Sequence, residues 1–223
     1  MKKFLVLLVA IFILTMAGQA QAAPFTNGSF EDPGHGGAQF TLAPGSTTIT
    51  GWTVGGVTPE GGINWSRTLW DNSDGDYSID LNGDVIDPLT ASSVFQTFDT
   101  VSGYEYFFSF DLSGNPGGGS GAVMTLDVEI DDAILGGFSY TLTGANATNN
   151  MLYATESFSF VAAGALTKLE FVSTTTSGGF DLRNGPVIDN VVLTNVVPEP
   201  GTMLLLGSGL IGIAGFRRKF RKR

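Results

Sequence analysis

The clearest structural pattern in the chain is residues 104–112, which read YEYFFSFDL. The even-numbered positions are all apolar, and the odd-numbered positions are polar with the exception of Phe107. Because successive side chains of a β-strand point to opposite faces of the sheet, this alternation predicts a strand with one face on a core and the other in water.

The same alternation recurs further along the chain. Residues 124–130 read MTLDVEI, and shorter alternating runs follow at 157–160 and 168–171. Residues 187–193 are apolar on both faces except for Asp189 and Asn190, which predicts a buried last strand. About ten short strands separated by turn-forming residues, with no helical window inside the domain, predict an all-β fold of the β-sandwich type.

The first 22 residues have the three parts of a secretory signal peptide. Lys2 and Lys3 form the charged start, residues 4–16 the apolar stretch, and Ala20-Gln21-Ala22 the cleavage signal. We predict cleavage after Ala22. An N-terminal transmembrane helix is the alternative, although the 13 residues of the apolar stretch are few for a membrane span. The β-sandwich domain is therefore expected to comprise residues 23–197 and to be exported.

The last 26 residues, 198–223, have a different composition. They begin with Pro198, Glu199 and Pro200, continue with a 15-residue apolar run at 202–216, and end with six Lys or Arg among the last seven residues. As a helix the run would be about 22 Å long, a little short of a bilayer core. The basic end would stay in the cytoplasm. One interpretation is an ordinary single transmembrane anchor.

The order of these features also resembles the PEP-CTERM sorting domain, in which a Pro-Glu-Pro tripeptide precedes a short apolar helix and a basic end. The resemblance implies that an exosortase in the inner membrane of a Gram-negative bacterium recognises Pro198, Glu199 and Pro200. It further implies an inner-membrane precursor that is then sorted to the cell surface or extracellular matrix.

The domain between the two targeting ends is strongly acidic. All 21 acidic residues of the chain except Glu199 lie in it, against the three basic residues Arg67, Lys168 and Arg183, which leaves a net charge of −17. Nucleic acid and anionic lipid are poor partners for such a surface, whereas calcium is a suitable one. The chain has no cysteine, so disulfides and thiol chemistry are excluded.

An acidic stretch at residues 71–76 reads DNSDGD and is followed by the predicted strand 77–81. Its three aspartates and Asp80 have the oxygen ligands that calcium prefers. Aligning Gly75 with the glycine of an EF-hand, however, puts Trp70 at the first ligand position and Leu81 at the last, so the stretch is not an EF-hand. A solvated acidic turn is the alternative to a metal-binding loop.

Several segments resemble the choice-of-anchor C proteins, which join one exported β-domain to interchangeable sorting tails. They are residues 27–31 (NGSFE), 49–52 (ITGW), 74–83 (DGDYSIDLNG), 96–98 (QTF), 110–116 (FDLSGNP) and 186–191 (PVIDNV). The resemblance extends to a plant cell-wall domain of unknown function and to galactose-binding-like modules. It implies a jelly-roll β-sandwich that is not an enzyme, with carbohydrate binding as an analogy.

The analogy also implies a site. Jelly-roll carbohydrate modules often hold a structural calcium between the first Phe-Glu turn and an acidic residue of the last strand, and the matching positions here are Glu31 and Asp189. A carboxylate in an apolar strand needs a partner, which a cation would supply. The alternative is that Asp189 caps a turn or meets water.

Three function classes remain open. Against an enzyme, the chain has no Gly-x-Ser-x-Gly motif, and its only histidine, His35, lies in a Gly-rich loop and is expected to be solvated. A carboxylate pair for glycoside hydrolysis stays possible. For a binding module, Trp70 and Tyr77 are the candidate ligand-binding aromatics, with Trp70 expected to be exposed; the alternative is that they belong to the core. The third class is a structural matrix protein cross-linked by calcium.

Overall fold

A computed structural model describes residues 24–56, 62–83, 92–176 and 183–196. The predicted signal peptide, residues 1–22, and the sorting segment, residues 198–223, lie outside these ranges. Within them the chain forms eleven strands and one short 3₁₀ helix. The strands are β1 (Gln39–Leu42), β2 (Thr53–Gly56), β3 (Ile63–Ser66), β4 (Ser78–Asp80), β5 (Ser92–Asp99), β6 (Glu105–Gly114), β7 (Val123–Ile130), β8 (Ala133–Thr141), β9 (Ala154–Val161), β10 (Leu166–Ser173) and β11 (Pro186–Val196). The described residues contain no helix long and apolar enough to cross a membrane.

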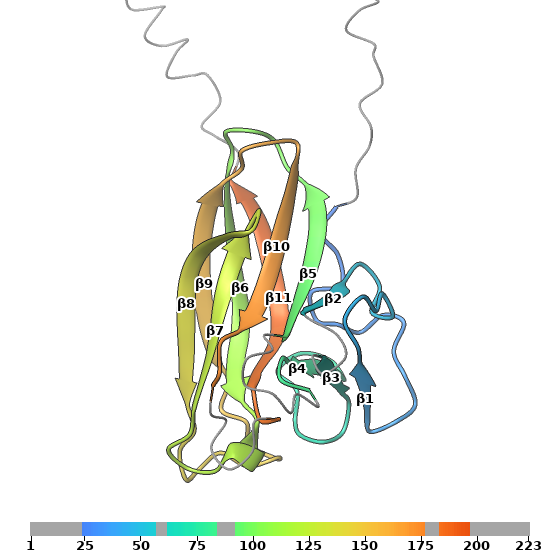
Figure 1. The fold of residues 1–223 in the computed structure, drawn as a ribbon, viewed down its shortest axis with the longest axis vertical. Coiled ribbons are helices and arrows are strands. Elements are labelled where there is room, and N and C mark those ends of the chain that lie inside the picture. The colour runs from blue at the N-terminus through green and yellow to red at the C-terminus, as the bar shows by residue number, and fades with distance from the viewer. Residues whose placement is uncertain (1–23, 57–61, 84–91, 177–182, 197–223) are drawn as a thin grey trace, which may run out of the picture.

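The strands form two antiparallel sheets packed face to face (Figure 1). The six-stranded sheet has the order β1-β3-β4-β11-β6-β9, and the five-stranded sheet has the order β2-β5-β10-β7-β8. In each sheet, strands that are far apart in sequence lie side by side. Examples are β4 with β11 in one sheet, and β2 with β5 and β5 with β10 in the other. The predicted all-β jelly-roll sandwich is thus confirmed.

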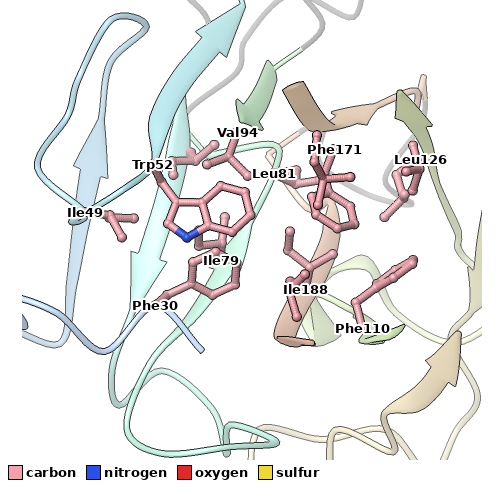
Figure 2. Packing of buried hydrophobic residues seen from close by; sticks show 14 of the residues in the cluster. Phe30, Ile49, Trp52, Ile79, Leu81, Val94, Phe110, Leu126, Phe171 and Ile188 are labelled. Carbon is pink, nitrogen blue, oxygen red and sulfur yellow. The ribbon is translucent and has the colours of Figure 1, made fainter. Parts of the chain in front are cut away.

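The core lies between the two sheets and is built from the alternating positions that the sequence pattern identified. The apolar even-numbered residues of β6 and β7 point inward, so that Phe110 and Leu126 are fully buried (Figure 2). Phe110 of the six-stranded sheet meets Phe171 of the five-stranded sheet edge to face, with ring centroids 5.0 Å apart. Such aromatic contacts add to the stabilisation that comes from burying apolar surface, and they help to fix how the two sheets pack against each other.

Some expected elements differ from the observed ones. Residues 47–54 read TTITGWTV, and their β-branched side chains predict one strand. In the structure β2 begins only at Thr53, because the chain turns at Ile49–Trp52 with Gly51 at a φ of +83°. Residues 114–121 read GNPGGGSG, a composition that predicts a flexible loop. In the structure they contain the 3₁₀ helix Pro116–Gly118, and the Asn115 side chain accepts a hydrogen bond from Gly117 N at its start. The edge strand β1 was not expected.

Candidate functional site

The acidic loop, residues 71–76, is held by carboxylates that reach it from two distant parts of the chain. Oδ2 of Asp189, on β11, accepts hydrogen bonds from the backbone N–H groups of Ser73 (2.8 Å) and Asp74 (3.0 Å). Oε1 of Glu31 accepts them from Asp76 and Tyr77, both at 2.9 Å. The two carboxylates therefore bind the backbone on either side of Gly75.

Gly75 is required where the loop passes Glu31. Its φ is +64°, a conformation that residues with a side chain rarely adopt, and a Cβ atom there would lie 2.4 Å from Glu31 Oε1. The sequence therefore places a glycine where the backbone must turn left-handed and approach a carboxylate closely.

A third carboxylate, Asp111 of β6, also bonds the loop, through the side chain of Ser73. Its Oδ2 accepts hydrogen bonds from Ser73 Oγ (2.7 Å) and Asn190 Nδ2 (3.1 Å), and its Oδ1 accepts one from Thr155 Oγ1 (2.6 Å). Although burial raises the pKa of Asp111, these three donors outweigh it and hold the pKa below its ordinary value. Asp111 is therefore a stably ionised anchor.

A β-bulge in β11 brings these groups together. Asp189 lies opposite Asp111, but the next register pair joins Val192 to Ser109, so β11 contains an extra residue at this point. Asn190 takes up the irregularity with a φ of +50° and donates to Asp111. Bulges redirect side chains in this way, and here Asp189 bonds the loop directly while Asn190 bonds Asp111.

The electrostatics of Asp189 differ from those of Asp111. Asp189 is fully buried, and burial raises its pKa to about 7, even though the N–H groups of Asp74, Asn190 and Ser73 lower it. Burial also raises the pKa of Glu31. The charge of Asp74 raises the pKa of both groups, so Asp74 repels Glu31 as well as Asp189.

These contacts bear on the predicted metal site. Glu31 and Asp189 do meet the same loop, as a shared site requires, but backbone N–H groups already supply their partners. Within the described residues, Glu129, Asp132 and Glu170 form the one group of three acidic side chains whose ligand atoms, within 4.8 Å of one another, could hold a metal ion. That group lies on the five-stranded sheet, and a lysine side chain already neutralises part of its charge. Lys168 Nζ lies 2.5 Å from Asp132 and 2.6 Å from Glu170.

The exposure expected for Trp70 was wrong. The side chain is only 6% exposed and packs against Met151 and Val187 on the outer face of the six-stranded sheet. Its Nε1 donates a hydrogen bond to Ser78 Oγ. Tyr77 is equally buried. Neither ring offers an open face to a ligand, because Trp70 is covered by Met151 and Val187, and Tyr77 packs against His35 and Trp65.

His35 is not the solvated loop residue that we expected. Its ring is half-buried against Phe40, Trp65 and Tyr77, with centroid distances of 4.3, 4.6 and 4.9 Å. The backbone of His35 donates to and accepts from the Tyr77 hydroxyl, both at 2.7 Å. The Gly-rich loop can fold back in this way because its glycines allow a tight turn.

Asp80, which the sequence grouped with the acidic loop, belongs elsewhere. It is fully buried in β4, where Oδ1 accepts from Asn82 N (2.8 Å) and Oδ2 from Asn115 Nδ2 (2.7 Å). Burial raises its pKa to about 7. By contrast, Asp71, Asp74 and Asp76 are exposed, so the loop is an acidic turn with an anchored backbone and exposed aspartates.

In the sequence, Phe107 stands out only as the one apolar residue among the polar odd-numbered positions of residues 104–112. It lies on the outer face of β6 and is 45% exposed, whereas its neighbours in the strand, Tyr106 and Phe108, are buried. The signal that could have identified it was the apolar residue at a polar position of an otherwise regular alternation.

The chain matches a known sorting motif and a known protein family. Residues 196–219 match the PEP-CTERM protein-sorting motif, which indicates export and sorting to the cell surface. Fold and motif together define a class, that of an exported jelly-roll β-sandwich protein with a C-terminal sorting signal. Residues 23–194 match the family described as "Protein of unknown function (DUF642)", and the chain belongs to that family. Membership of the choice-of-anchor C family stays a prediction.

Solved structures share the fold. A cyclase from Fischerella sp. TAU, in complex with 4-(1H-indol-3-yl)butan-2-one, superposes with a TM-score of 0.50 at 15% identity, over 81% of this chain and all of that one. Family 35 carbohydrate-binding modules are also similar. The module from Paenibacillus barcinonensis has a TM-score of 0.41 at 16% identity, over 71% of this chain and 98% of its own. The module from Clostridium thermocellum has 0.43 at 7%, over 70% and 98%. At these identities the likeness concerns the fold alone. Among curated proteins, none matches the sequence.

Proposed function

We propose that this is an exported protein, sorted by an exosortase to the cell surface or extracellular matrix, whose β-sandwich binds a glycan without catalysing a reaction on it. The observation that carries the proposal is the position of the sorting motif, whose match begins at residue 196, the last residue of β11. The folded domain is followed at once by the sorting segment, as suits a domain that is displayed rather than released into the cytoplasm.

Two features support a glycan as the ligand. The domain's net charge of −17 disfavours nucleic acid and anionic lipid. Hydroxyl-bearing side chains also line the outer face of β6 and β9, where Ser109 lies opposite Ser157 and Asp111 opposite Thr155. Hydroxyl groups both donate and accept hydrogen bonds, which suits the hydroxyls of a sugar.

The experiment replaces Pro198, Glu199 and Pro200 together by alanine in the full chain and follows the protein by cell fractionation. Retention in the inner membrane is expected, while Thr202→Ala, just beyond the tripeptide, should reach the surface normally. Unchanged surface delivery of the triple variant would overturn the exosortase as partner. Glycan binding is tested separately, by retention of the wild-type chain on immobilised polysaccharides.

Glycoside hydrolysis is the second candidate, and one observation favours it. Glu129 and Glu170 lie directly opposite each other on β7 and β10, with ligand atoms within 4.8 Å. Burial and the charge of Glu170 raise the pKa of Glu129, as a general acid requires, while Lys168 keeps Glu170 in an ion pair. Release of reducing sugar by the wild type, lost in Glu129→Gln and Glu170→Gln, would establish this activity in place of simple binding.

A structural calcium at Glu31 and Asp189 is proposed as part of the binding protein. Glu31, Asp74 and Asp189 gather around the acidic loop, and the pKa values of Glu31 and Asp189 are raised, which supports the proposal. The ion pair between Arg67 and Asp76 of the loop is long, at 4.0 Å. The ion would use the carboxylate lone pairs that the N–H groups leave, together with backbone carbonyls or water. Calcium-dependent self-association without glycan retention would instead favour a calcium-cross-linked matrix protein.

A further inference from the structure

The outer face of the six-stranded sheet is covered over part of its area and open over the rest. Loops carrying Trp70 and Met151 cover β4 and the start of β11. Beyond Asp111 the outer positions of β6, β9 and β11 are uncovered. We call this open part the Phe107 face; its members are Phe107 and Ser109 of β6, Ser157, Ser159 and Val161 of β9, and Val192 and Thr194 of β11.

The strand register places Phe107 at the centre of this face. Its direct partners are Thr194 on β11 and Ser159 on β9. Val192 pairs with Ser109, and Val161 pairs with Glu105, so both valines are diagonal neighbours of Phe107. Diagonal positions of this kind are within reach of an aromatic side chain.

The apolar members of the face are exposed to a degree that packing does not require. Phe107 is 45% exposed, Val192 48% and Val161 63%. A single exposed apolar side chain is ordinary, but three at neighbouring register positions of one sheet face form an apolar patch. The core of β6 is complete without Phe107, because Tyr106, Phe108 and Phe110 fill it from the other side of the strand.

The chemistry around Phe107 suits a sugar chain. An aromatic ring offers an apolar surface against which the C–H face of a pyranose can stack, and hydroxyl groups beside it can bond the sugar's equatorial hydroxyls. Phe107 has Thr194 on one side and Ser159 on the other, and Ser159 Oγ is already oriented by a 3.0 Å hydrogen bond to Glu105 Oε1. The same sheet face thus offers a sugar both a stacking surface and hydrogen-bonding hydroxyl groups.

The charges on the face restrict what can bind. Glu105 lies at one end of it and Asp111 at the other, and no strand position that forms the face is Lys or Arg. Of the three basic residues of the domain, Arg67 lies over Tyr77, Lys168 lies over Phe95 on the opposite sheet, and Arg183 precedes β11 and is not part of a strand of this face. An acidic polysaccharide would meet like charges at both ends, whereas an uncharged one would not.

We propose that the Phe107 face binds a neutral polysaccharide chain, with Phe107 as the stacking platform and Ser109, Ser159 and Thr194 as hydrogen-bonding partners. The proposal rests on the glycan-binding function proposed above and specifies its location and ligand class. The acidic loop closes one end of the face, because Ser73 bonds Asp111 there.

The test measures binding of the full chain, in detergent micelles, to soluble neutral β-glucan and galactan and to anionic polygalacturonate. Phe107→Ala should weaken binding of a neutral chain about tenfold or more, as expected for loss of an aromatic contact. Phe107→Trp should retain it. Phe40→Ala is the matched control, because Phe40 is similarly exposed, at 44%, on the opposite edge strand of the same sheet and should leave affinity unchanged.

The outcomes separate this inference from the function on which it rests. Binding by the wild type that Phe107→Ala leaves intact, with both proteins melting alike, overturns the Phe107 face and leaves glycan binding in place. Binding of polygalacturonate in preference to the neutral chains overturns the ligand class. Failure of the wild type to bind any of the three overturns both proposals.

Discussion

Glu31 and Asp189, from the two ends of the folded domain, hold the same loop by its backbone. Asp189 accepts from the N–H groups of Ser73 and Asp74, and Glu31 accepts from those of Asp76 and Tyr77. The three aspartates of the loop remain exposed, so this acidic stretch is fixed in position chiefly through its backbone.

Loss of the Asp189 carboxylate should destabilise the fold. Asp189→Ala leaves the backbone N–H groups of Ser73 and Asp74 without their acceptor, and a hydrogen bond to a charged group contributes about 1.5–3 kcal/mol. We expect the free energy of unfolding, measured by urea titration, to fall by roughly that amount or more for the two groups. Asp71→Ala, at an exposed position of the same loop, is the control and should change it by less than about 0.5 kcal/mol. Equal effects of the two substitutions would contradict the anchoring role.

Gly75→Ala should be more costly than an ordinary glycine replacement. Both Gly75 and Gly45 have positive φ, but a Cβ at Gly75 would meet Glu31 Oε1, whereas nothing lies within 4 Å of one at Gly45. Gly45→Ala should therefore show only the backbone strain of about 1–2 kcal/mol. Gly75→Ala should exceed it, because Glu31 must also move. Thermal melting of both variants measures the difference, and a Gly75 effect no larger than that of Gly45 would refute the close approach.

Stability should fall as the pH rises from about 4 to about 7. Burial raises the pKa of Asp80 and of Asp189 from 3.8 to about 7, so in this window the folded state binds protons that the unfolded state has lost. A shift of that size corresponds to roughly 4 kcal/mol per group. The melting temperature should therefore be higher at pH 5 than at pH 8, and level above pH 8.

The control for this pH dependence is Asp80→Asn, which removes one of the two titrating groups. The variant should show about half of the wild-type change between pH 5 and pH 8, whatever its absolute stability. A wild-type melting temperature that rises over the same interval would show that the two carboxyl groups are not buried as described.

Calcium should raise the melting temperature of the full chain if it binds at Glu31 and Asp189, and the rise should be larger at pH 8 than at pH 5. The reason is that protons compete with the ion for Asp189, whose pKa lies near 7. Glu31→Gln keeps the shape and the acceptor oxygen but removes the charge, so it should abolish most of the calcium effect.

Glu129→Gln distinguishes between the two possible calcium sites, that of Glu31 and Asp189 and that of the acidic group on the five-stranded sheet. It should leave the calcium effect unchanged if the ion lies at Glu31 and Asp189. If Glu129→Gln abolishes the effect and Glu31→Gln does not, the ion lies with Glu129, Asp132 and Glu170 on the other sheet. A melting temperature that does not respond to calcium or to chelator rules out a structural ion in both places.

The sequence by itself determined the β-sandwich fold class and the sorting of the protein to the cell surface. The alternation in residues 104–112 and 124–130 is a local property of each strand, since one buried face must be apolar every second residue. The sorting motif is likewise contiguous, so reading the last 26 residues was enough to find it. Strand ends were less predictable, because a turn such as the one at Gly51 depends on the groups around it.

Only the tertiary structure decided which residues meet. That Trp70 is buried follows from Met151 and Val187, which the chain brings from far away. That Glu31 and Asp189 share a loop follows from the register of β4 beside β11 and from a bulge that no local pattern encodes. That Phe107 lies on an open face depends on where covering loops end. Contacts between distant segments are set by the packing of whole sheets, whereas periodicity records only which side of its own strand a residue takes.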